Sequence, residues 1–410
     1  MTATELYYDP YDYAIDADPY PVWQRMRDEA PVYFNERHGF YALTRYDDVL
    51  AGLTDTEAFR SSHGIVIETI GADDLQIPML IMMDPPAHTQ LRQLVSRAFT
   101  PKTIASLEPR IRNICADLLD PLVGLDRFDY IGEFAGLLPP TVILALLGFP
   151  DGYAAGFRET VDSAFHIDDG DESMNTLLTD QIREQGVGAA NAELGSEVFD
   201  MLPELMEQRR RDPQDDLISG LVHSEIEDDG ERRMLTDDEI HAFVQLLSLA
   251  GTETVARLLG FAAVTLARFA GERELLVADR SIIPNAVEEL LRFEAPSPIQ
   301  GRWLAHDIEL HGTVIPRGST IALLNGSADR DERHFPDPDR FDARRVIDRH
   351  LGFGYGAHFC IGAALARLEA RVALDETLRR FPAWDIGDDG LERVHTTTVR
   401  GYSSVPMLPS

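Results

Sequence analysis

The chain has 410 residues, of which 44% are hydrophobic and 26% are charged, so it is long enough to bury a large core. Its formal net charge is −33, which disfavours nucleic acid and anionic membranes as partners because like charges repel. Segment 1–20 lacks a basic stretch followed by an apolar one, and no run approaches the roughly 20 apolar residues of a membrane span. We therefore expect a cytoplasmic protein that binds neither membranes nor nucleic acid.

Most of the sequence shows the apolar spacing of helices. The predicted helices cover residues 22–30, 88–98, 103–119 and 181–210. Strand-like stretches are few and short, and they cover residues 32–41, 307–313 and 320–324. Two acidic stretches, 168–172 and 225–233, are expected to be solvated loops. Because no repeat or linker interrupts the chain, we expect one domain over 1–410, mainly α with a small β subdomain.

The longest predicted helix begins with a capping box, in which Thr236 and Glu239 bind each other's backbone N–H groups. The apolar pattern runs to Ala270, and Gly271 is a typical residue just beyond a helix. About 35 residues give a helix of roughly 50 Å, which spans a whole domain. We expect its middle to be buried because both flanks are apolar.

That middle, residues 250–254, reads Ala-Gly-Thr-Glu-Thr. Glycine weakens a helix, threonine binds back to carbonyl groups, and a buried carboxylate needs a partner. Such local conflicts are typical of functional sites, although a kinked helix with a satisfied polar cluster would show the same pattern.

A second polar pattern is the Glu289–Arg292 pair, whose spacing places both side chains on one helix face. An exposed surface pair would have the same spacing and would contribute little. Arg340 follows about fifty residues later and is expected to supply a second arginine to Glu289.

The third pattern is the stretch 353–362, which reads Phe-Gly-Tyr-Gly-Ala-His-Phe-Cys-Ile-Gly and precedes a predicted helix over 363–380. Glycines allow the backbone to turn tightly and to approach a flat ligand. Cys360 is then expected at a helix N-terminus, where the dipole and free N–H groups stabilise a thiolate. The other cysteine, Cys115, lies in an apolar stretch and is expected in the core.

These three patterns, in this order and spacing, resemble those of the bacterial cytochromes P450. The family's haem-binding signature, Phe-x-x-Gly-x-His-x-Cys-x-Gly, is matched at every position, while 250–254 resembles its oxygen-activation motif and 289–292 its structural ion pair. Residues 84–92 resemble the segment before a helix that touches the haem. The resemblance covers the chain from about Asp18 onward. It implies the cytochrome P450 fold, with haem b (iron protoporphyrin IX) between the long helix and the helix that follows Cys360.

The resemblance also implies residue roles. Cys360 would be the iron ligand, within a loop to which Phe353 and Gly354 contribute. The two haem propionates would be held by four residues, His88, Arg92, Arg302 and His358, in agreement with the need of buried carboxylates for cationic or N–H partners.

On the opposite haem face, Ala250 and Gly251 would leave room for dioxygen, and Glu253 with Thr254 would form an acid–alcohol pair that delivers protons. The apolar loop 63–83 is expected to cover a hydrophobic pocket. The substrate contacts expected there are Leu246, Ile299, Val66 and Ile67. Ordinary core packing would give these four the same composition.

The activity that the resemblance implies is a haem-thiolate monooxygenase that inserts one atom of dioxygen into a small hydrophobic molecule. Electrons would come from NAD(P)H through a ferredoxin and its reductase, and the protein would act as a monomer. Because a ferredoxin is acidic, its docking requires a locally basic surface. The candidates are Arg97, Lys102, Arg344, Arg345, Arg349, Arg367 and Arg371.

Three other readings remain open at this level. A peroxygenase of the same fold would use hydrogen peroxide and commonly lacks the acid–alcohol pair. A haem-thiolate sensor would keep Cys360 but would have little need for Thr254. Residues 352–357 also fit a relaxed dinucleotide-binding fingerprint, which belongs near the start of a βαβ unit rather than near the C-terminal end of a chain.

Overall fold

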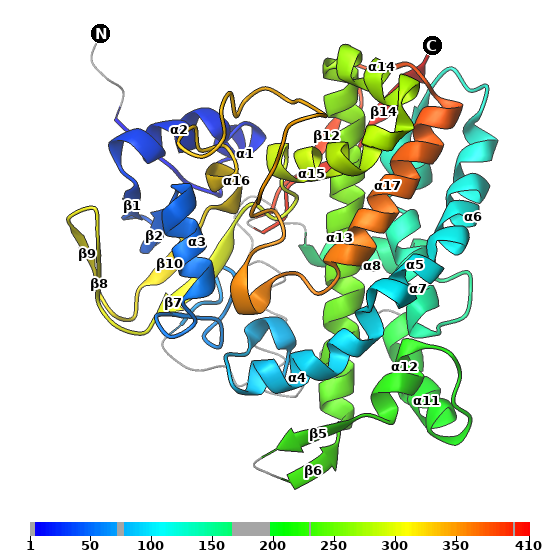
Figure 1. Ribbon diagram of the computed structural model, residues 1–410, viewed down its shortest axis with the longest axis horizontal. Helices are drawn as coiled ribbons and strands as arrows, with labels where there is room; N and C mark the ends of the chain where they lie inside the picture. Colours follow the sequence, from blue (N-terminus) through cyan, green and yellow to red (C-terminus); the bar gives the residue numbers. More distant parts are fainter. Residues whose placement is uncertain (1–4, 72–77, 166–196, 229–230, 397) are drawn as a thin grey trace.

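The computed structural model describes residues 5–71, 78–165, 197–228, 231–396 and 398–410. A large helical part and a smaller part built around a sheet lie side by side (Figure 1). The described α-helices, in chain order, are α1 (Tyr13–Ala17), α2 (Tyr20–Glu29), α3 (Tyr46–Thr54), α4 (Ala87–Val95), α5 (Pro101–Ser106), α6 (Glu108–Leu119), α7 (Leu138–Leu147), α8 (Ala154–Phe165), α11 (Glu197–Arg211), α12 (Leu217–Val222), α13 (Asp237–Arg268), α14 (Ala270–Ala278), α15 (Ile283–Phe293), α16 (Asn325–Ala328) and α17 (Ala363–Arg380).

The main sheet has five strands in the order β1-β2-β10-β7-β3, and only β2 and β10 run parallel to each other. The described strands are β1 (Val32–Asn35), β2 (Phe40–Leu43), β3 (Phe59–Arg60), β4 (Phe128–Asp129), β5 (Glu225–Asp228), β6 (Glu231–Met234), β7 (Gln300–Leu304), β8 (Ile308–Leu310), β9 (Thr313–Ile315), β10 (Thr320–Leu323), β11 (Trp384–Ile386), β12 (Glu392–Val394), β13 (Gly401–Ser404) and β14 (Pro406–Pro409). A mainly antiparallel sheet excludes the doubly wound fold of dinucleotide-binding domains.

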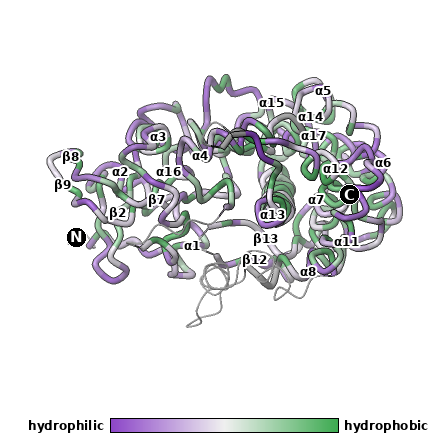
Figure 2. The backbone as a smooth tube through the Cα atoms, turned by 90° about the horizontal axis from the view of Figure 1, so that it is seen from below, coloured by the Kyte–Doolittle hydropathy of each residue, from purple (hydrophilic) through white to green (hydrophobic). Residues whose placement is uncertain are grey.

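The long helix α13 is the axis of the helical part and begins with the predicted capping box. The Thr236 hydroxyl accepts from the Glu239 N–H at 3.2 Å, and the Glu239 carboxylate accepts from the Thr236 N–H at 2.8 Å. Most of its 32 residues are buried, and many of the apolar ones belong to the largest hydrophobic cluster. Figure 2 shows α13 nearly end-on and coloured mainly as hydrophobic, with α7, α12 and α17 on one side of it.

The end of α13 differs from the prediction. The helix stops at Arg268, and Gly271 lies inside the following helix α14. Phe269 separates the two helices with φ −107° and ψ 63°, and its ring packs against Phe293 and Phe341. The half-buried, packed ring of Phe269, rather than the glycine, therefore marks the break between the two helices.

Two other predictions are corrected. The helix expected over 103–119 is divided at Leu107, because Pro109 lacks an N–H group and occupies the first turn of α6. The acidic stretch 225–233 belongs to the hairpin β5–β6 rather than to a loop, and Ile226 of this hairpin packs against the core. Of the helix expected over 181–210, only the part in α11 is described; the stretch 168–172 lies outside the described residues.

Among the described helices, α13 alone is long and apolar enough to cross a membrane, and 78% of its most apolar window is buried inside the protein. The same composition is typical of a core helix. The hairpins predicted over 32–41 and 307–313, the strand over 320–324 and the helix over 363–380 all form, with shifts of a few residues at their ends.

Candidate active site

The Cys360 loop connects the residues after Leu351 to the start of α17. The Cys360 N–H donates to the Phe353 carbonyl at 3.0 Å, which closes the loop upon itself. Gly354 and Gly356 have φ values of 65° and 71°, a region that side chains disfavour. A Cβ atom on Gly356 would also lie 2.7 Å from the Leu53 carbonyl of α3. The loop therefore needs glycine at both positions and holds the cysteine just before α17.

The electrostatics of Cys360 combine opposing effects. Burial raises the pKa of its thiol, while the N–H groups of Gly362 and Ala363 and the charges of Arg92 and Arg367 lower it. The expected helix-terminal stabilisation of a thiolate is present, but burial outweighs it in the polypeptide alone. An iron ion at the sulfur would add the positive charge that deprotonates a coordinating thiol.

Arg367 of α17 contacts the Cys360 loop through Phe353, a role that was not predicted. Its guanidinium lies 4.5 Å from the centroid of the Phe353 ring and forms two hydrogen bonds with Glu288 of α15, at 2.7 and 2.8 Å. His350 binds the same carboxylate at 3.1 Å. Burial raises the pKa of Glu288, but these two partners overcome it and hold the pKa at about 2.

The four predicted propionate ligands converge from three parts of the chain. His88 and Arg92 share one face of α4, Arg302 lies on β7, and His358 ends the short turn before Cys360. The rings of His88 and His358 are 4.3 Å apart. Arg92 donates to the Phe359 carbonyl, which ties α4 to the Cys360 loop.

This cluster has buried hydrogen-bonding capacity that no described residue uses. Both ring nitrogens of His88 are buried without a described partner, and no described carboxylate forms an ion pair with Arg92 or Arg302 within 4 Å. Burial lowers the pKa of His88 to about 4, that of His358 to about 2 and that of Arg302 to about 10. Anionic carboxylates at this place would satisfy these donors, so the residues fit the propionates of a haem.

The middle of α13 presents two different faces. Ala250 and Thr254 lie four residues apart on one face, where Ala250 is exposed and the Thr254 hydroxyl donates to the Ala250 carbonyl at 2.9 Å. Glu253 and Arg257 lie on another face, about 100° around the helix, and form an ion pair at 2.7 Å. Gly251 is half-buried, and a Cβ atom on it would lie 3.6 Å from the Ile143 side chain.

The predicted acid–alcohol pair is therefore adjacent in sequence but divided in space. Glu253 is only 4% exposed and is bound to Arg257, rather than turned toward Thr254 or solvent. Arg257 was missed, although its spacing of four residues from Glu253 is a readable signal for an ion pair.

The predicted substrate contacts fall in two clusters. Ile67 and Ile299 pack together in the hydrophobic cluster beside the sheet, whereas Leu246 packs against the larger cluster around α13. Val66 is half-buried, and the loop that carries it lies on β7 because the Gly301 N–H donates to the Ile65 carbonyl at 2.8 Å. Residues 72–77 of this loop are outside the described part.

The Glu289–Arg292 pair is completely buried, with N–O distances of 2.6 and 2.8 Å. The second arginine on Glu289 is Arg345 at 3.0 Å, and not the predicted Arg340. Arg340 is exposed and contributes only its carbonyl group, which accepts from Arg345 at 2.8 Å. The chain turns between these residues, so the arginine five positions later reaches the carboxylate.

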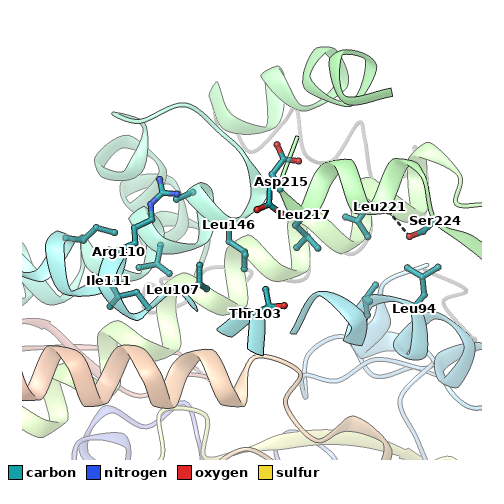
Figure 3. Close-up of a pocket in the computed structure, with 16 residues that line it drawn as sticks. Leu94, Thr103, Leu107, Arg110, Ile111, Leu146, Asp215, Leu217, Leu221 and Ser224 are labelled. Carbon is teal, nitrogen blue, oxygen red and sulfur yellow. Dashed lines mark hydrogen bonds between the residues drawn. The ribbon is translucent and has the colours of Figure 1, made fainter. Parts of the chain in front are cut away.

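A separate cavity of about 380 Å³ lies between α4, α5, α6, α7 and α12 (Figure 3). Its walls are mainly apolar, and they include Leu94, Leu107, Ile111, Leu146, Leu217 and Leu221. No predicted substrate residue lines it. Leu94 and Val95 of this wall belong to α4, the helix that also carries His88 and Arg92.

The chain resembles known proteins over nearly its whole length. A sequence profile for Cytochrome P450 matches residues 275–397. The putative cytochrome P450 123 of Mycobacterium tuberculosis (strain ATCC 25618 / H37Rv) is 41% identical over 406 residues, which cover 98% of this chain and 97% of that protein. The 6-deoxyerythronolide B hydroxylase of Saccharopolyspora erythraea is 35% identical over 405 residues, which cover 95% of this chain and 96% of that protein.

Among solved structures, a mutant of P450 EryK in complex with erythromycin B has a TM-score of 0.85 to this chain, at 33% identity and with 97% of both chains covered. The chain therefore belongs to the cytochrome P450 family and has its fold. It is a P450 monooxygenase, and its cofactor is haem.

We predict that Glu289→Ala will abolish stable haem incorporation. The substitution leaves Arg292 buried without its carboxylate, and breaking a buried pair costs about 3–5 kcal/mol. Haem bound per polypeptide, measured after purification, should fall to a small fraction of the wild-type value. Glu29→Ala, which removes an exposed pair with Arg25, should keep full haem content. Normal haem content in Glu289→Ala would contradict the structural role of this pair.

Proposed function

We propose that this monooxygenase uses electrons from NAD(P)H, delivered by a ferredoxin and its reductase, to insert one oxygen atom into a hydrophobic small molecule. The observation that carries the proposal is the convergence of the four predicted propionate ligands on the loop that holds Cys360. When bound, haem with a thiolate ligand supplies the binding and reductive cleavage of dioxygen. We further propose that residues 1–410 act as one domain, in a monomeric, cytoplasmic protein.

The residue roles follow from the site. Cys360 provides the iron ligand, within the loop that Phe353 and Gly354 shape. His88, Arg92, Arg302 and His358 would bind and neutralise the propionates, because they offer N–H donors without described carboxylate partners. Glu289, Arg292 and Arg345 keep the loop in place and take no part in the chemistry.

On α13, Ala250 and Gly251 would leave room for dioxygen, since neither carries a bulky side chain. The Thr254 hydroxyl, now bound to the Ala250 carbonyl, would order water on this face, while Glu253 would supply protons from the other.

The spectrum of the reduced holoprotein with carbon monoxide tests the ligand assignment. A Soret band shifted to the red, as thiolate ligation gives in this family, is the expected result. Cys360→His should retain the fold but lose that shift. An unshifted band in the wild-type protein, at full haem content, would exclude thiolate ligation.

Measurements of turnover with different oxidants and electron donors distinguish the monooxygenase from a peroxygenase and from a haem-thiolate sensor. A monooxygenase consumes NADH when ferredoxin and reductase are supplied, a peroxygenase turns over with hydrogen peroxide alone, and a sensor does neither. The presence of both Glu253 and Thr254 on α13 favours the first. The dehydrogenase reading is excluded by the fold, because residues 352–357 lie in the Cys360 loop outside any βαβ unit.

We predict that Thr254→Ala will uncouple NADH consumption from product formation. Without the hydroxyl, water is no longer ordered for the second proton, and hydrogen peroxide escapes. The peroxide released per NADH should rise several-fold. Thr252→Ala is the matched control, because that hydroxyl donates to the Ser248 carbonyl at 2.7 Å on a buried face, and it should stay coupled. Equal peroxide yields in both variants would refute the role of Thr254.

The substrate proposal rests on the apolar residues beside the site and on the relatives. Ile67 and Ile299 pack together near β7, and Met79 and Leu80 of the same loop are buried. One relative is named for hydroxylation of 6-deoxyerythronolide B, and a neighbouring structure holds erythromycin B. Both compounds are suitable first probes in a screen for spin-state changes of the haem.

Fewer of the seven candidate basic residues are available to bind an electron donor than the sequence suggested. Three of the candidate arginines have partners within the protein: Arg345 binds Glu289, Arg367 binds Glu288 and Arg349 stacks on Tyr355. The side chain of Arg97 is outside the described set. Arg344, Lys102 and Arg371 are exposed, and the last two lie on α5 and α17, which pack against each other (Figure 1).

We predict that reversing the charge at Lys102 and Arg371 together will slow reduction by ferredoxin at low salt. Complementary charges raise association rates by about tenfold or more, and this gain declines with ionic strength. The double variant Lys102→Glu/Arg371→Glu should lose most of the salt dependence measured by stopped-flow reduction. The control is Arg25→Glu. Arg25 belongs to α2, at the other side of the molecule in Figure 1, so this variant should be reduced at the wild-type rate. Unchanged rates in the double variant would rule out this docking surface.

A further inference from the structure

The cavity between α4, α5, α6, α7 and α12 has the size and the walls of a small-molecule site (Figure 3). Its volume of about 380 Å³ falls in the range of about 300–1,000 Å³ that is typical of ligand pockets. Besides leucines, the walls include Ile111, Ile114 and Val142. Transfer of a hydrocarbon chain from water to such walls is favourable, so the cavity suits an aliphatic ligand.

The wall that α12 forms contains a glycine where a larger side chain would narrow the cavity. Leu217, Gly220, Leu221 and Ser224 line the cavity, and their spacing places them on one face of the helix. A Cβ atom on Gly220 would have no other heavy atom of the described residues within 4 Å. Glycine weakens a helix relative to alanine. The chain therefore has a helix-weakening residue at a position that keeps the cavity wide.

Most polar groups around the cavity are already bound within the protein. The Asp216 carboxylate accepts from Arg209 and from the Ser219 N–H. The Ser224 hydroxyl donates to the Gly220 carbonyl at 2.7 Å. These groups have little capacity left for a ligand.

Arg110 of α6 is different, because its guanidinium is available. The side chain is 55% exposed, and the only carboxylate of the described residues within 4 Å is that of Asp151, at 3.8 Å and itself 94% exposed. That distance is too long for a hydrogen bond, and such exposed pairs contribute little. Figure 3 shows Arg110 at one end of the row of side chains that line the cavity and Leu94 at the other. A ligand with one anionic end and a hydrocarbon chain would match this arrangement.

The start of α6 adds a second attraction for an anion. Leu107, which precedes the helix, provides no side-chain cap, and both Leu107 and Arg110 line the cavity. The first turn of a helix carries a partial positive charge and N–H groups without partners inside the helix. The acid of this turn, Glu108, is bound to Arg112 at 3.0 Å. A carboxylate at Arg110 would therefore meet a full positive charge and the positive end of a helix dipole.

We propose that this cavity is an effector site, separate from the haem pocket, which binds an apolar monocarboxylate such as a medium-chain fatty acid. The carboxylate binds the Arg110 guanidinium, whose planar fork matches it, and the hydrocarbon chain lies between α7 and α12. Asp215, which is exposed and also lines the cavity, would instead favour an aliphatic cation. None of the described residues that line the cavity is aromatic, and aromatic faces are what recognise quaternary ammonium groups.

The helix α4 connects this site to the haem site. Leu94 and Val95 line the cavity, and Arg92 of the same helix donates to the Phe359 carbonyl next to Cys360. A ligand that packs against Leu94 and Val95 therefore contacts the helix that is tied to the Cys360 loop. We expect it to change the affinity of the haem site for its own ligands, and such coupling acts equally in both directions.

The ligand class is tested with three probes that share one tail: octanoate, octanol and octyltrimethylammonium. Binding is measured by calorimetry on the ferric holoprotein with 4-phenylimidazole bound at the haem iron, which keeps the haem pocket occupied. A single octanoate should bind, and octanol should bind about tenfold or more weakly, because it lacks the charge-assisted hydrogen bonds. Tighter binding of octyltrimethylammonium than of octanoate would overturn the proposal.

Two charge variants test the head-group contact. Arg110→Gln should weaken octanoate binding about tenfold or more while octanol binding stays unchanged, because only the charged contact is lost. Asp215→Asn should tighten octanoate binding, since a like charge is removed. Both side chains are exposed, so both variants should keep the fold and the haem. Octanoate binding that does not respond to Arg110→Gln would refute the role of Arg110.

Gly220→Leu tests the location of the ligand. The added side chain should fill the cavity and abolish binding of octanoate and octanol alike, and leucine is a better helix former than glycine. The matched control is Gly271→Leu in α14, another exposed helical glycine whose Cβ atom would have no described heavy atom within 4 Å. It should bind both probes as the wild type does. Undiminished octanoate binding in Gly220→Leu would place the ligand elsewhere and overturn the proposal.

The effector role is tested at the haem. The affinity for 4-phenylimidazole, measured from the Soret band, should change several-fold when octanoate is saturating, in the wild type and in Gly271→Leu but not in Gly220→Leu. An unchanged affinity in the wild type would refute the coupling through α4. A change that persists in Gly220→Leu would show that octanoate competes inside the haem pocket and would overturn the separate site. None of these readouts depends on the electron donor or on Thr254.

Discussion

The buried carboxylate of Glu289 is the contact on which the position of Cys360, the proposed iron ligand, depends. It binds Arg292 on its own helix, Arg345 from the irregular segment after α16, and the N–H of Asp342 at 3.1 Å. Arg292 in turn donates to the Asp329 carbonyl at 2.8 Å, and the Asp329 carboxylate accepts from the Leu351 N–H at 2.7 Å. This chain of contacts leads directly to the loop that carries the cysteine. Removing a partner from a buried charge is costly, so these contacts to Glu289 restrict the arrangement of the segment that leads to Cys360.

Around Cys360, the positively charged and the negatively charged side chains of the site lie on different sides. The positive and imidazole groups of α4, β7 and the Cys360 loop gather at the edge where anionic carboxylates of the cofactor would lie. The negative charge of Glu253 is directed away from this edge and is compensated by Arg257. Separation matters because opposite charges placed together would neutralise each other and leave nothing to bind the propionates. The helix α13 separates Glu253 from Thr254 because it has 3.6 residues per turn. The two side chains therefore lie on different faces although they are adjacent in the sequence.

Several features were readable from the sequence because they depend on neighbours along the chain. The capping box at Thr236, the Glu289–Arg292 pair and the glycine-rich loop each lie within about ten residues. The end of α13 and the partner of Glu289 were predicted wrongly, since Phe269 and Arg345 act through contacts with residues far away in the sequence. Two errors had a local signal that was not used: Pro109, which divides α5 from α6, and Arg257, which stands four residues after Glu253.

The sequence by itself determined the family and the cofactor, and it predicted Cys360 as the ligand, because a tight loop with left-handed glycines and a following helix is encoded within ten residues. It also predicted the four residues that would hold the propionates, but only through resemblance to the family. The tertiary structure decided which arginine completes the Glu289 network, which cations remain available to a partner, and that Glu253 is held by Arg257 against β13. These outcomes depend on which distant backbone groups approach a buried charge, and desolvation makes that approach decisive.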